Sequence, residues 1–174
     1  RDVMGRCGLG PGDIFLHMMP LFHTTGCAIC VLGIIDAGAA MLLAPVFDPA
    51  TMVEVIERER PGFLLGVPTM LVALCNEAAG SGRDVSSLKR ILSGGAMVAP
   101  ELINRVKDVF GPTVQIIYGQ TECSPVITMV WEDDSMADLT GTIGQPLPNM
   151  DVAILDPQTA AVVPVGVQGE ICTR

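Results

Sequence analysis

The sequence predicts an α/β fold, in which a mostly parallel β-sheet is flanked by helices and followed by the start of a β-rich subdomain. Through the first 130 residues, short apolar runs of strand length alternate with longer segments of helical period. This alternation is typical of a parallel sheet that is covered on both faces. From Trp131 onward the helical period is lost, and short strands separated by glycine and proline follow. We therefore expect an α/β subdomain over residues 1–130, and a linker with a partial β-barrel-like subdomain over residues 131–174.

Length and composition narrow the class of protein further. The 174 residues suffice for one ordinary domain, and a content of 49% hydrophobic against 17% charged residues excludes a disordered chain. The formal net charge is -9 and aromatic residues make up only 4%. Nucleic-acid binding needs clustered cations and often stacking aromatics, so we expect neither a nucleic-acid partner nor attraction to an anionic membrane surface.

The first half of the chain is expected to hold three strands and three helices. Asp48 followed by Pro49 is typical of a helix start, and Pro61 should end that helix. Pro68 should open the next one. The expected strands cover residues 14–18, 40–44 and 63–66, and the expected helices cover 26–37, 49–60 and 68–78.

One apolar stretch, residues 26–47, has about the length of a membrane helix, which is roughly 20 residues. Asp36 lies in its middle, glycines interrupt it, and no Lys or Arg flanks it. We therefore favour a buried helix followed by a buried strand over a membrane span. No signal peptide is evident after Arg1.

The second half should hold one clear helix among several strands. Between Pro100 and Phe110, apolar residues recur at helical spacing and charged residues take the other side. Strands are expected at 90–93, 114–118 and 126–130. After an acidic loop, strands are expected at 151–156 and 169–173, with no further helix.

Six cysteines are spread through apolar segments, which is the pattern of a reduced, intracellular protein. Cys27 and Cys30 form a lone C-x-x-C. A zinc site would need a second pair, and a redox site would normally lie at a polar helix start. Core packing is therefore favoured for this pair over a redox site.

Three polar or glycine-rich segments interrupt the apolar sequence, and each follows a predicted strand. They are PLFHTTG at 20–26, SGGA at 93–96 and YGQTECSP at 118–125. Ligands of parallel sheets bind at the carboxyl ends of the strands, so we expect the three segments to meet at one edge. The alternative for each segment is a plain turn.

These segments carry side chains that suit a nucleotide. Gly94 and Gly95 would let a flat ligand approach the backbone, because neither has a Cβ atom. Tyr118 could stack on a purine, Thr121 could donate to a phosphate oxygen, and Glu122 could hold a divalent cation between phosphates.

The two histidines have different settings in the sequence. His17 lies inside a predicted strand and is expected to be structural. His23 follows that strand on a loop, where a structural role and a place in a ligand pocket both remain open. A general base is less favoured for His23, because no orienting carboxylate is evident.

Five motifs stand in order along nearly the whole chain: MPLFHTTG, ILSGGAMV, IIYGQTECSP, GTIGQPLPN and GEICTR. Together they resemble the adenylate-forming enzymes, the superfamily of acyl-CoA synthetases, luciferases and peptide-synthetase adenylation domains. The motifs are most similar to those of medium- or long-chain fatty-acid CoA ligases, because Thr121 is retained where fatty-acyl-AMP ligases usually have alanine. The apolar stretch CAICVLG stands where peptide-synthetase domains usually carry an aspartate, and it suits an acyl tail.

The resemblance implies an AMP-forming acid–thiol ligase that uses ATP, Mg2+ and coenzyme A, with a fatty acid as the expected substrate. The implied nucleotide-binding residues are Gly94, Gly95, Ala96, Tyr118, Gly119, Gln120 and Thr121. The implied catalytic residues are His23 beside the substrate carboxylate, Thr121 on the α-phosphate and Glu122 as the magnesium ligand.

The resemblance also implies parts that this sequence does not contain. The family's phosphate loop and its lysine should precede Arg1, and its ribose-binding aspartate, hinge and small C-terminal domain should follow Arg174. We therefore expect the central fragment of the large N-terminal domain of a cytoplasmic enzyme, inactive on its own. The alternatives are an aryl- or short-chain-acid CoA ligase and a non-catalytic, truncated binding protein.

Overall fold

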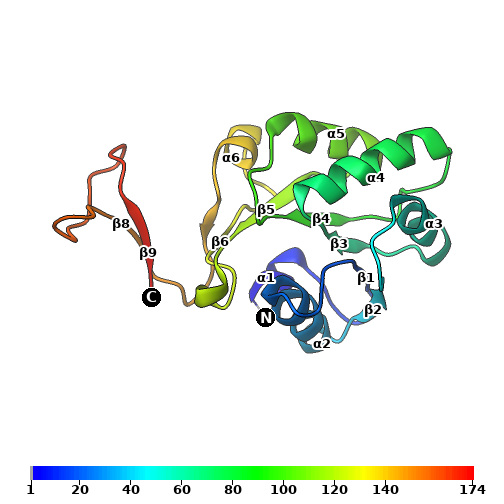
Figure 1. The fold of residues 1–174 in the computed structure, drawn as a ribbon, viewed down its shortest axis with the longest axis horizontal. Helices are drawn as coiled ribbons and strands as arrows, with labels where there is room; N and C mark the ends of the chain where they lie inside the picture. Colours follow the sequence, from blue (N-terminus) through cyan, green and yellow to red (C-terminus); the bar gives the residue numbers. More distant parts are fainter. Residues whose placement is uncertain (1) are drawn as a thin grey trace.

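The main body of the protein is one seven-stranded sheet (Figure 1). The computed structural model describes residues 2–174. The strands are β1 (Ile14–His17), β2 (Ala40–Leu43), β3 (Phe63–Leu65), β4 (Arg90–Ser93), β5 (Val114–Tyr118), β6 (Thr128–Met129) and β7 (Gln145–Pro146). Their order is β2-β1-β3-β4-β5-β6-β7, with β1 to β5 parallel and β6 and β7 antiparallel. The predicted α/β class with a mostly parallel sheet is confirmed.

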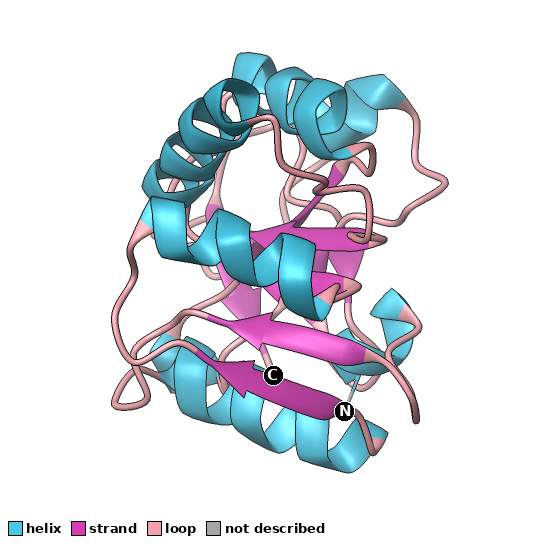
Figure 2. Ribbon diagram, turned by 90° about the vertical axis from the view of Figure 1, so that its right-hand side faces the viewer, coloured by secondary structure: helices cyan, strands magenta, loops and turns pink. Residues whose placement is uncertain are grey.

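Helices cover both faces of this sheet (Figure 2). One layer holds α1 (Asp2–Cys7), the π-helix η1 (Thr25–Leu32) and α2 (Gly33–Ala37), and the other holds α3 (Pro49–Glu59), α4 (Pro68–Ser81) and α5 (Pro100–Phe110). A further helix, α6 (Met136–Gly141), packs beside α5.

Successive side chains along each strand point alternately into two hydrophobic cores, one on each face of the sheet. Along β1, Leu16 belongs to the core under α3, α4 and α5, whereas Phe15 belongs to the core under α1, η1 and α2. Ile91 and Leu92 divide in the same way along β4. Successive side chains of a strand point to opposite faces, so strands buried on both faces must be apolar throughout.

The helix that follows β2 begins and ends as its sequence predicts. The Asp48 carboxylate accepts a hydrogen bond from the Thr51 amide at 2.8 Å, and Pro49 occupies the first turn. Arg60 ends the helix in the left-handed conformation with φ 52°, directly before Pro61.

Three expectations about local structure were wrong or incomplete. The helix expected over 26–37 is a π-helix that passes into an α-helix at Gly33. A helix, α6, lies after Trp131, where none was expected; it is capped by Ser135, whose hydroxyl accepts from the Asp138 amide. The helix α1 at Asp2–Cys7 was also not among the expected elements.

The expected strand over 126–130 is shorter than predicted, and the last two strands form a separate hairpin. β6 pairs only at Thr128 and Met129. β8 (Val152–Leu155) and β9 (Glu170–Thr173) pair with each other and lie apart from the main body in Figure 1. Because β7 belongs to the large sheet, the change of sheet falls after Pro146; the division of the chain at residue 130 stays a prediction.

The stretch 26–47 contributes η1, α2 and β2 to the body of the protein, but the expectation that it is buried was only partly right. Leu32 and Ile35 are exposed, and β2 is an edge strand with both of its end residues exposed. Among residues 2–174, none of the helices combines the length and the apolar character needed to span a membrane. Arg1 lies outside the described residues.

Candidate active site

Three loops meet at the carboxyl edge of the parallel sheet, as expected. The loops that follow β1, β4 and β5 together line a cavity of about 330 Å³. His23 comes from the first loop, Gly95 from the second, and Tyr118, Thr121 and Glu122 come from the third. Residues that are nearly 100 positions apart in sequence therefore share one wall, because parallel strands end at one edge.

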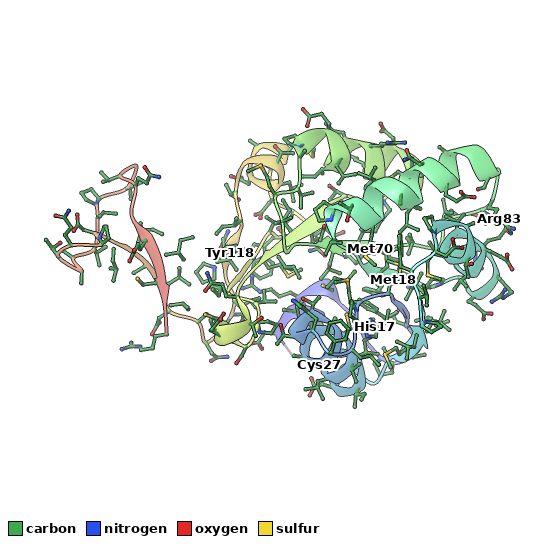
Figure 3. All side chains as sticks on the ribbon, in the orientation of Figure 1. His17, Met18, Cys27, Met70, Arg83 and Tyr118 are labelled. Atoms are coloured by element: carbon green, nitrogen blue, oxygen red, sulfur yellow. The ribbon has the colours of Figure 1, made fainter. Side chains whose placement is uncertain are left out.

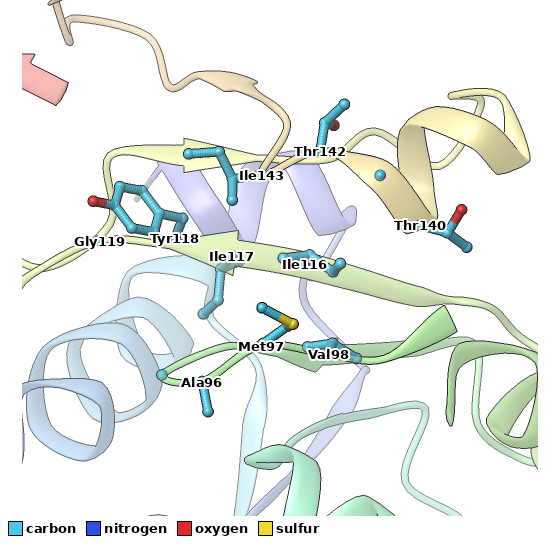
Figure 4. Close-up of a pocket in the computed structure, with 12 residues that line it drawn as sticks. Ala96, Met97, Val98, Ile116, Ile117, Tyr118, Gly119, Thr140, Thr142 and Ile143 are labelled. Atoms are coloured by element: carbon cyan, nitrogen blue, oxygen red, sulfur yellow. The ribbon is translucent and has the colours of Figure 1, made fainter. Parts of the chain in front are cut away.

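A second, larger cavity of about 780 Å³ adjoins the first and shares Gly95, Ile117, Tyr118 and Gly119 with it. Residues Ile116 and Ile117 of β5 lie between the segment of Met97 and that of Thr142 in Figure 4. Residues Thr140–Ile143, from the end of α6 and the turn after it, complete the lining. Three of them, Gly141–Ile143, begin the GTIGQPLPN motif, to which we assigned no binding role. The Ser135 cap could have indicated α6, but nothing in the sequence placed this helix beside β5.

A third cavity, of about 250 Å³, lies on the side of η1. It shares Ile29, Pro125 and Val126 with the 330 Å³ cavity, so these three residues stand between the two spaces. Ile29 and Val126 are buried, and both belong to the core under α1 and η1.

Gly94 and Gly95 have different roles in the structure. Gly94 is buried and is absent from the linings of the three cavities; a Cβ added there would meet the Ile117 carbonyl oxygen and, at 2.9 Å, the Ile117 Cγ1 atom. Gly95 is exposed at the cavity wall with φ 77°, a conformation that glycine adopts without strain. Ala96 lines only the larger cavity.

The loop after β5 turns back on itself at once. Thr121–Cys123 form one turn of 3-10 helix, and Ser124 follows in the left-handed region with φ 60°. The Ile127 amide then donates to the Tyr118 carbonyl at 2.8 Å. This tight turn leaves Gln120, Thr121 and Glu122 exposed beside the cavity. Figure 3 shows Tyr118 at the side of the main body that faces the β8–β9 hairpin.

The two histidine rings are held by backbone amides. His23 is exposed, and its Nδ1 atom accepts from the Thr25 amide at 3.1 Å. In the neutral ring the proton must therefore be on Nε2, which is left as a donor. His17 is fully buried, its Nδ1 accepts from the Met19 amide at 3.3 Å, and burial lowers its pKa. The structural role expected for His17 agrees with this position.

A hydroxyl that the sequence analysis missed lies next to the predicted phosphate-binding threonine. The Thr24 Oγ1 atom is 3.4 Å from the Thr121 Oγ1 atom, across the cavity wall from loop to loop. Nothing in the PLFHTTG segment distinguished Thr24 from its neighbour Thr25.

Charged side chains are sparse around the cavities. Of the described residues that line the 330 and 780 Å³ cavities, Glu122 alone is an Asp, Glu, Lys or Arg. The ion pairs of Arg83 with Glu54 and Glu57 lie on the surface of α3, and the side chains that form them are 38–49% exposed. Within the described part of the chain, no group of three or more His, Cys, Asp or Glu side chains is placed to hold a metal ion.

The expectation that the C-x-x-C pair packs in the core holds for only one of its members. Cys30 is fully buried, and burial raises the pKa of its thiol to about 12. Cys27 is exposed on η1 (Figure 3).

Comparison with known proteins gives consistent matches. The model of the AMP-binding enzyme family matches residues 2–174. The chain is 38% identical over 157 residues to a putative acyl-CoA synthetase, YngI, of Bacillus subtilis, covering 90% of this chain and 29% of that protein. It is 30% identical over 174 residues to 4-coumarate–CoA ligase 1 of Oryza sativa subsp. japonica, covering 96% of this chain and 30% of the ligase.

Solved structures agree on the fold. ATP-bound MatB from Rhodopseudomonas palustris superposes with a TM-score of 0.87 at 23% identity, over 99% of this chain and 33% of that one. The chain thus spans about a third or less of the length of the proteins it matches.

Proposed function

The chain belongs to the family of AMP-binding enzymes, the adenylate-forming superfamily, and from this premise we propose that the whole protein is an ATP-dependent acyl-CoA synthetase. A carboxylate oxygen of the acid attacks the α-phosphorus of ATP, forming an acyl-adenylate and releasing pyrophosphate. The coenzyme A thiolate then attacks the acyl carbon, forming the thioester and releasing AMP. The observation that carries the proposal is the cavity where the three loops meet, with an imidazole, a hydroxyl and a carboxylate on its wall.

The nucleotide is assigned to the two cavities that share Tyr118. The Tyr118 ring and the exposed backbone of Gly95 and Ala96 suit the flat adenine, while Gly119 and Gln120 bring backbone close to the acyl-adenylate. Gly94 supports this wall from beneath, since it lets the loop after β4 lie against β5. Thr121 has a hydroxyl free to donate to an α-phosphate oxygen, which suits alignment of the phosphate for attack.

Glu122 is the residue proposed to hold Mg2+. Its carboxylate is a hard oxygen ligand, exposed at the cavity wall. Magnesium usually takes one or two carboxylates and fills its other positions with phosphate oxygens and water, so a single glutamate fits the donor set. When bound, the ion supplies positive charge that neutralises the phosphate oxygens.

His23 is proposed to contact the substrate carboxylate. Because its Nδ1 accepts from the Thr25 amide, the Nε2 side is available to donate toward the cavity. This contact orients the acid beside the α-phosphate and needs no proton transfer.

The acid is proposed to be aliphatic, with a fatty acid as the expected substrate. Ile29 and Val126, which line both the 330 Å³ cavity and the neighbouring 250 Å³ cavity, are apolar and suit contact with an acyl chain. An aryl acid is the second candidate, favoured by the 30% identity to a plant 4-coumarate–CoA ligase.

The piece of 174 residues is proposed to be inactive alone, and the enzyme is proposed to work in the cytoplasm. The matched proteins are about three times as long, and the three loops supply no cation to the phosphates. All six cysteines are free, which suits a reducing compartment.

ATP–pyrophosphate exchange tests these proposals. The full-length protein should exchange label with an acid from a panel of short-, medium- and long-chain aliphatic acids and aryl acids, and the preferred acid decides between the substrate candidates. No exchange with any acid would favour a non-catalytic binding protein. Robust exchange by the 174-residue piece would refute its inactivity.

A further inference from the structure

The Thr24 hydroxyl takes no part in capping its own helix. Thr24 stands directly before η1, but its backbone is already helical, with φ -57° and ψ -34°, whereas an N-cap residue has non-helical dihedrals. The Thr24 side chain makes no capping hydrogen bond, and the His23 ring accepts from the Thr25 amide instead. The Thr24 hydroxyl is thereby free for another partner.

That partner is the Thr121 hydroxyl, 3.4 Å away and 97 residues further along the chain. Thr24 is half-buried at the cavity wall, whereas Thr121 is exposed on a single 3-10 turn. The distance is longer than the usual 2.7–2.8 Å of a hydroxyl pair, so the hydrogen bond between the two hydroxyls is weak at this separation.

A phosphate ligand would impose a direction on this pair. A hydroxyl has one proton and two lone pairs, whereas a phosphate oxygen at neutral pH accepts only. When Thr121 donates to a phosphate oxygen, the proton between the two threonines must come from Thr24. Thr24 then donates to Thr121, and Thr121 donates to the phosphate. Each hydrogen bond in such a chain polarises the next.

We propose that Thr24 is a positioning residue, which donates to Thr121 and so fixes that hydroxyl toward the α-phosphate. The inference rests on the proposed function, because it takes Thr121 as the phosphate contact. In this role Thr24 acts only through Thr121, although both residues line the same cavity.

Four variants of the full-length protein test the inference: Thr24→Val, Thr24→Ser, Thr121→Val and the Thr24→Val/Thr121→Val double variant. Valine keeps the branched shape without the hydroxyl, and serine keeps the hydroxyl. Thr69→Val, on the exposed first turn of α4 and outside the cavities, is the matched control.

In ATP–pyrophosphate exchange, Thr24→Val should lower kcat about threefold to tenfold, the range of one net hydrogen bond, with KM for the acid changed less than about twofold. Thr24→Ser should stay within about twofold of the wild type, and Thr69→Val should match it. The double variant should be no slower than Thr121→Val, because Thr24 acts only through Thr121.

Two results would overturn the inference while the proposed function stands. One is exchange by Thr24→Val equal to that of Thr69→Val. The other is an equal loss from Thr24→Val in the wild type and in the Thr121→Val background, which would mean that Thr24 acts directly.

ATP affinity, measured by calorimetry, separates the two levels of proposal. If the wild type exchanges with no acid, the proposed function fails. In that case the pairing would still be supported if Thr24→Val weakened ATP binding in the wild-type background and had no effect in the Thr121→Val background. Equal ATP affinity in all variants would overturn the pairing.

Discussion

Gly119→Ala tests whether the site depends on the close packing of Gly119 against the backbone of Pro125 and Val126, in the loop after β5. A Cβ atom at this position would lie 2.8 Å from the Val126 Cα atom and even closer to the Pro125 carbonyl oxygen. Both obstacles are backbone atoms, so no side-chain rotation relieves the contact. The Ile127 amide, which donates to the Tyr118 carbonyl at 2.8 Å, ties the same two segments together.

The expected cost combines two effects. Overpacking costs about 1–3 kcal/mol, and losing the Ile127–Tyr118 hydrogen bond costs about 1 kcal/mol. Gly119→Ala should therefore lower the free energy of unfolding by about 2–4 kcal/mol. It should also reduce adenylation more than stability explains, because Thr121 and Glu122 lie on the displaced turn.

Two other glycines serve as controls. Gly80 lies in the last turn of α4, with no atom within 4 Å of an added Cβ, so Gly80→Ala should stabilise by about 0.5–1 kcal/mol. Gly95 has space but a φ of 77°, so Gly95→Ala should cost about 1–2 kcal/mol through backbone strain alone.

Urea denaturation monitored by circular dichroism gives the three free energies, and pyrophosphate exchange by the full-length variants gives the activities. A free energy of unfolding for Gly119→Ala within about 0.5 kcal/mol of the wild type would refute the reasoning, since surface substitutions without structural effect fall in that range.

The remaining predictions concern the metal, one buried base and the cysteines. Glu122→Gln should raise the Mg2+ concentration needed for half-maximal exchange; an unchanged Mg2+ dependence would refute its role as ligand. Burial lowers the pKa of His17 below its ordinary value of 6.5, so the unfolded chain binds the proton more readily and stability falls as the pH drops below about 6.5. His17→Gln should flatten that fall, by at most about 1.4 kcal/mol per pH unit, in urea titrations between pH 6.5 and 5.5; equal slopes would contradict the assignment. Iodoacetamide should label exposed Cys27 and spare Cys30, whose thiol pKa is raised to about 12, and mass spectrometry that finds both labelled equally fast would revive a redox role.

Elements with strong local signals were predicted close to their observed bounds. Asp48 with Pro49 marks the start of α3, and Pro100 with the apolar spacing to Phe110 marks α5. These signals work because a cap and an apolar stripe act within one or two turns of the same segment.

Elements without such signals were missed or mistaken. The Ser135–Asp138 cap lies in a short acidic segment in which apolar residues do not recur at helical spacing, so the sequence predicts a loop where the structure has α6. The π-helical form of η1 has no distinct side-chain period, since its apolar residues suit an α-helix equally well.

The sequence alone determined the alternation of strands and helices from β1 to β5, although not α1, α6 or β7. It also brought His23, Tyr118, Thr121 and Glu122 to one edge, because parallel strands must end on the same side. Only the tertiary structure decided which atoms meet there. It placed α6 beside β5, gave Gly94 a packing position beneath the site, and set the Thr24 hydroxyl 3.4 Å from Thr121. Such contacts depend on how separate segments pack in three dimensions, and the spacing of residues along the chain does not predict them.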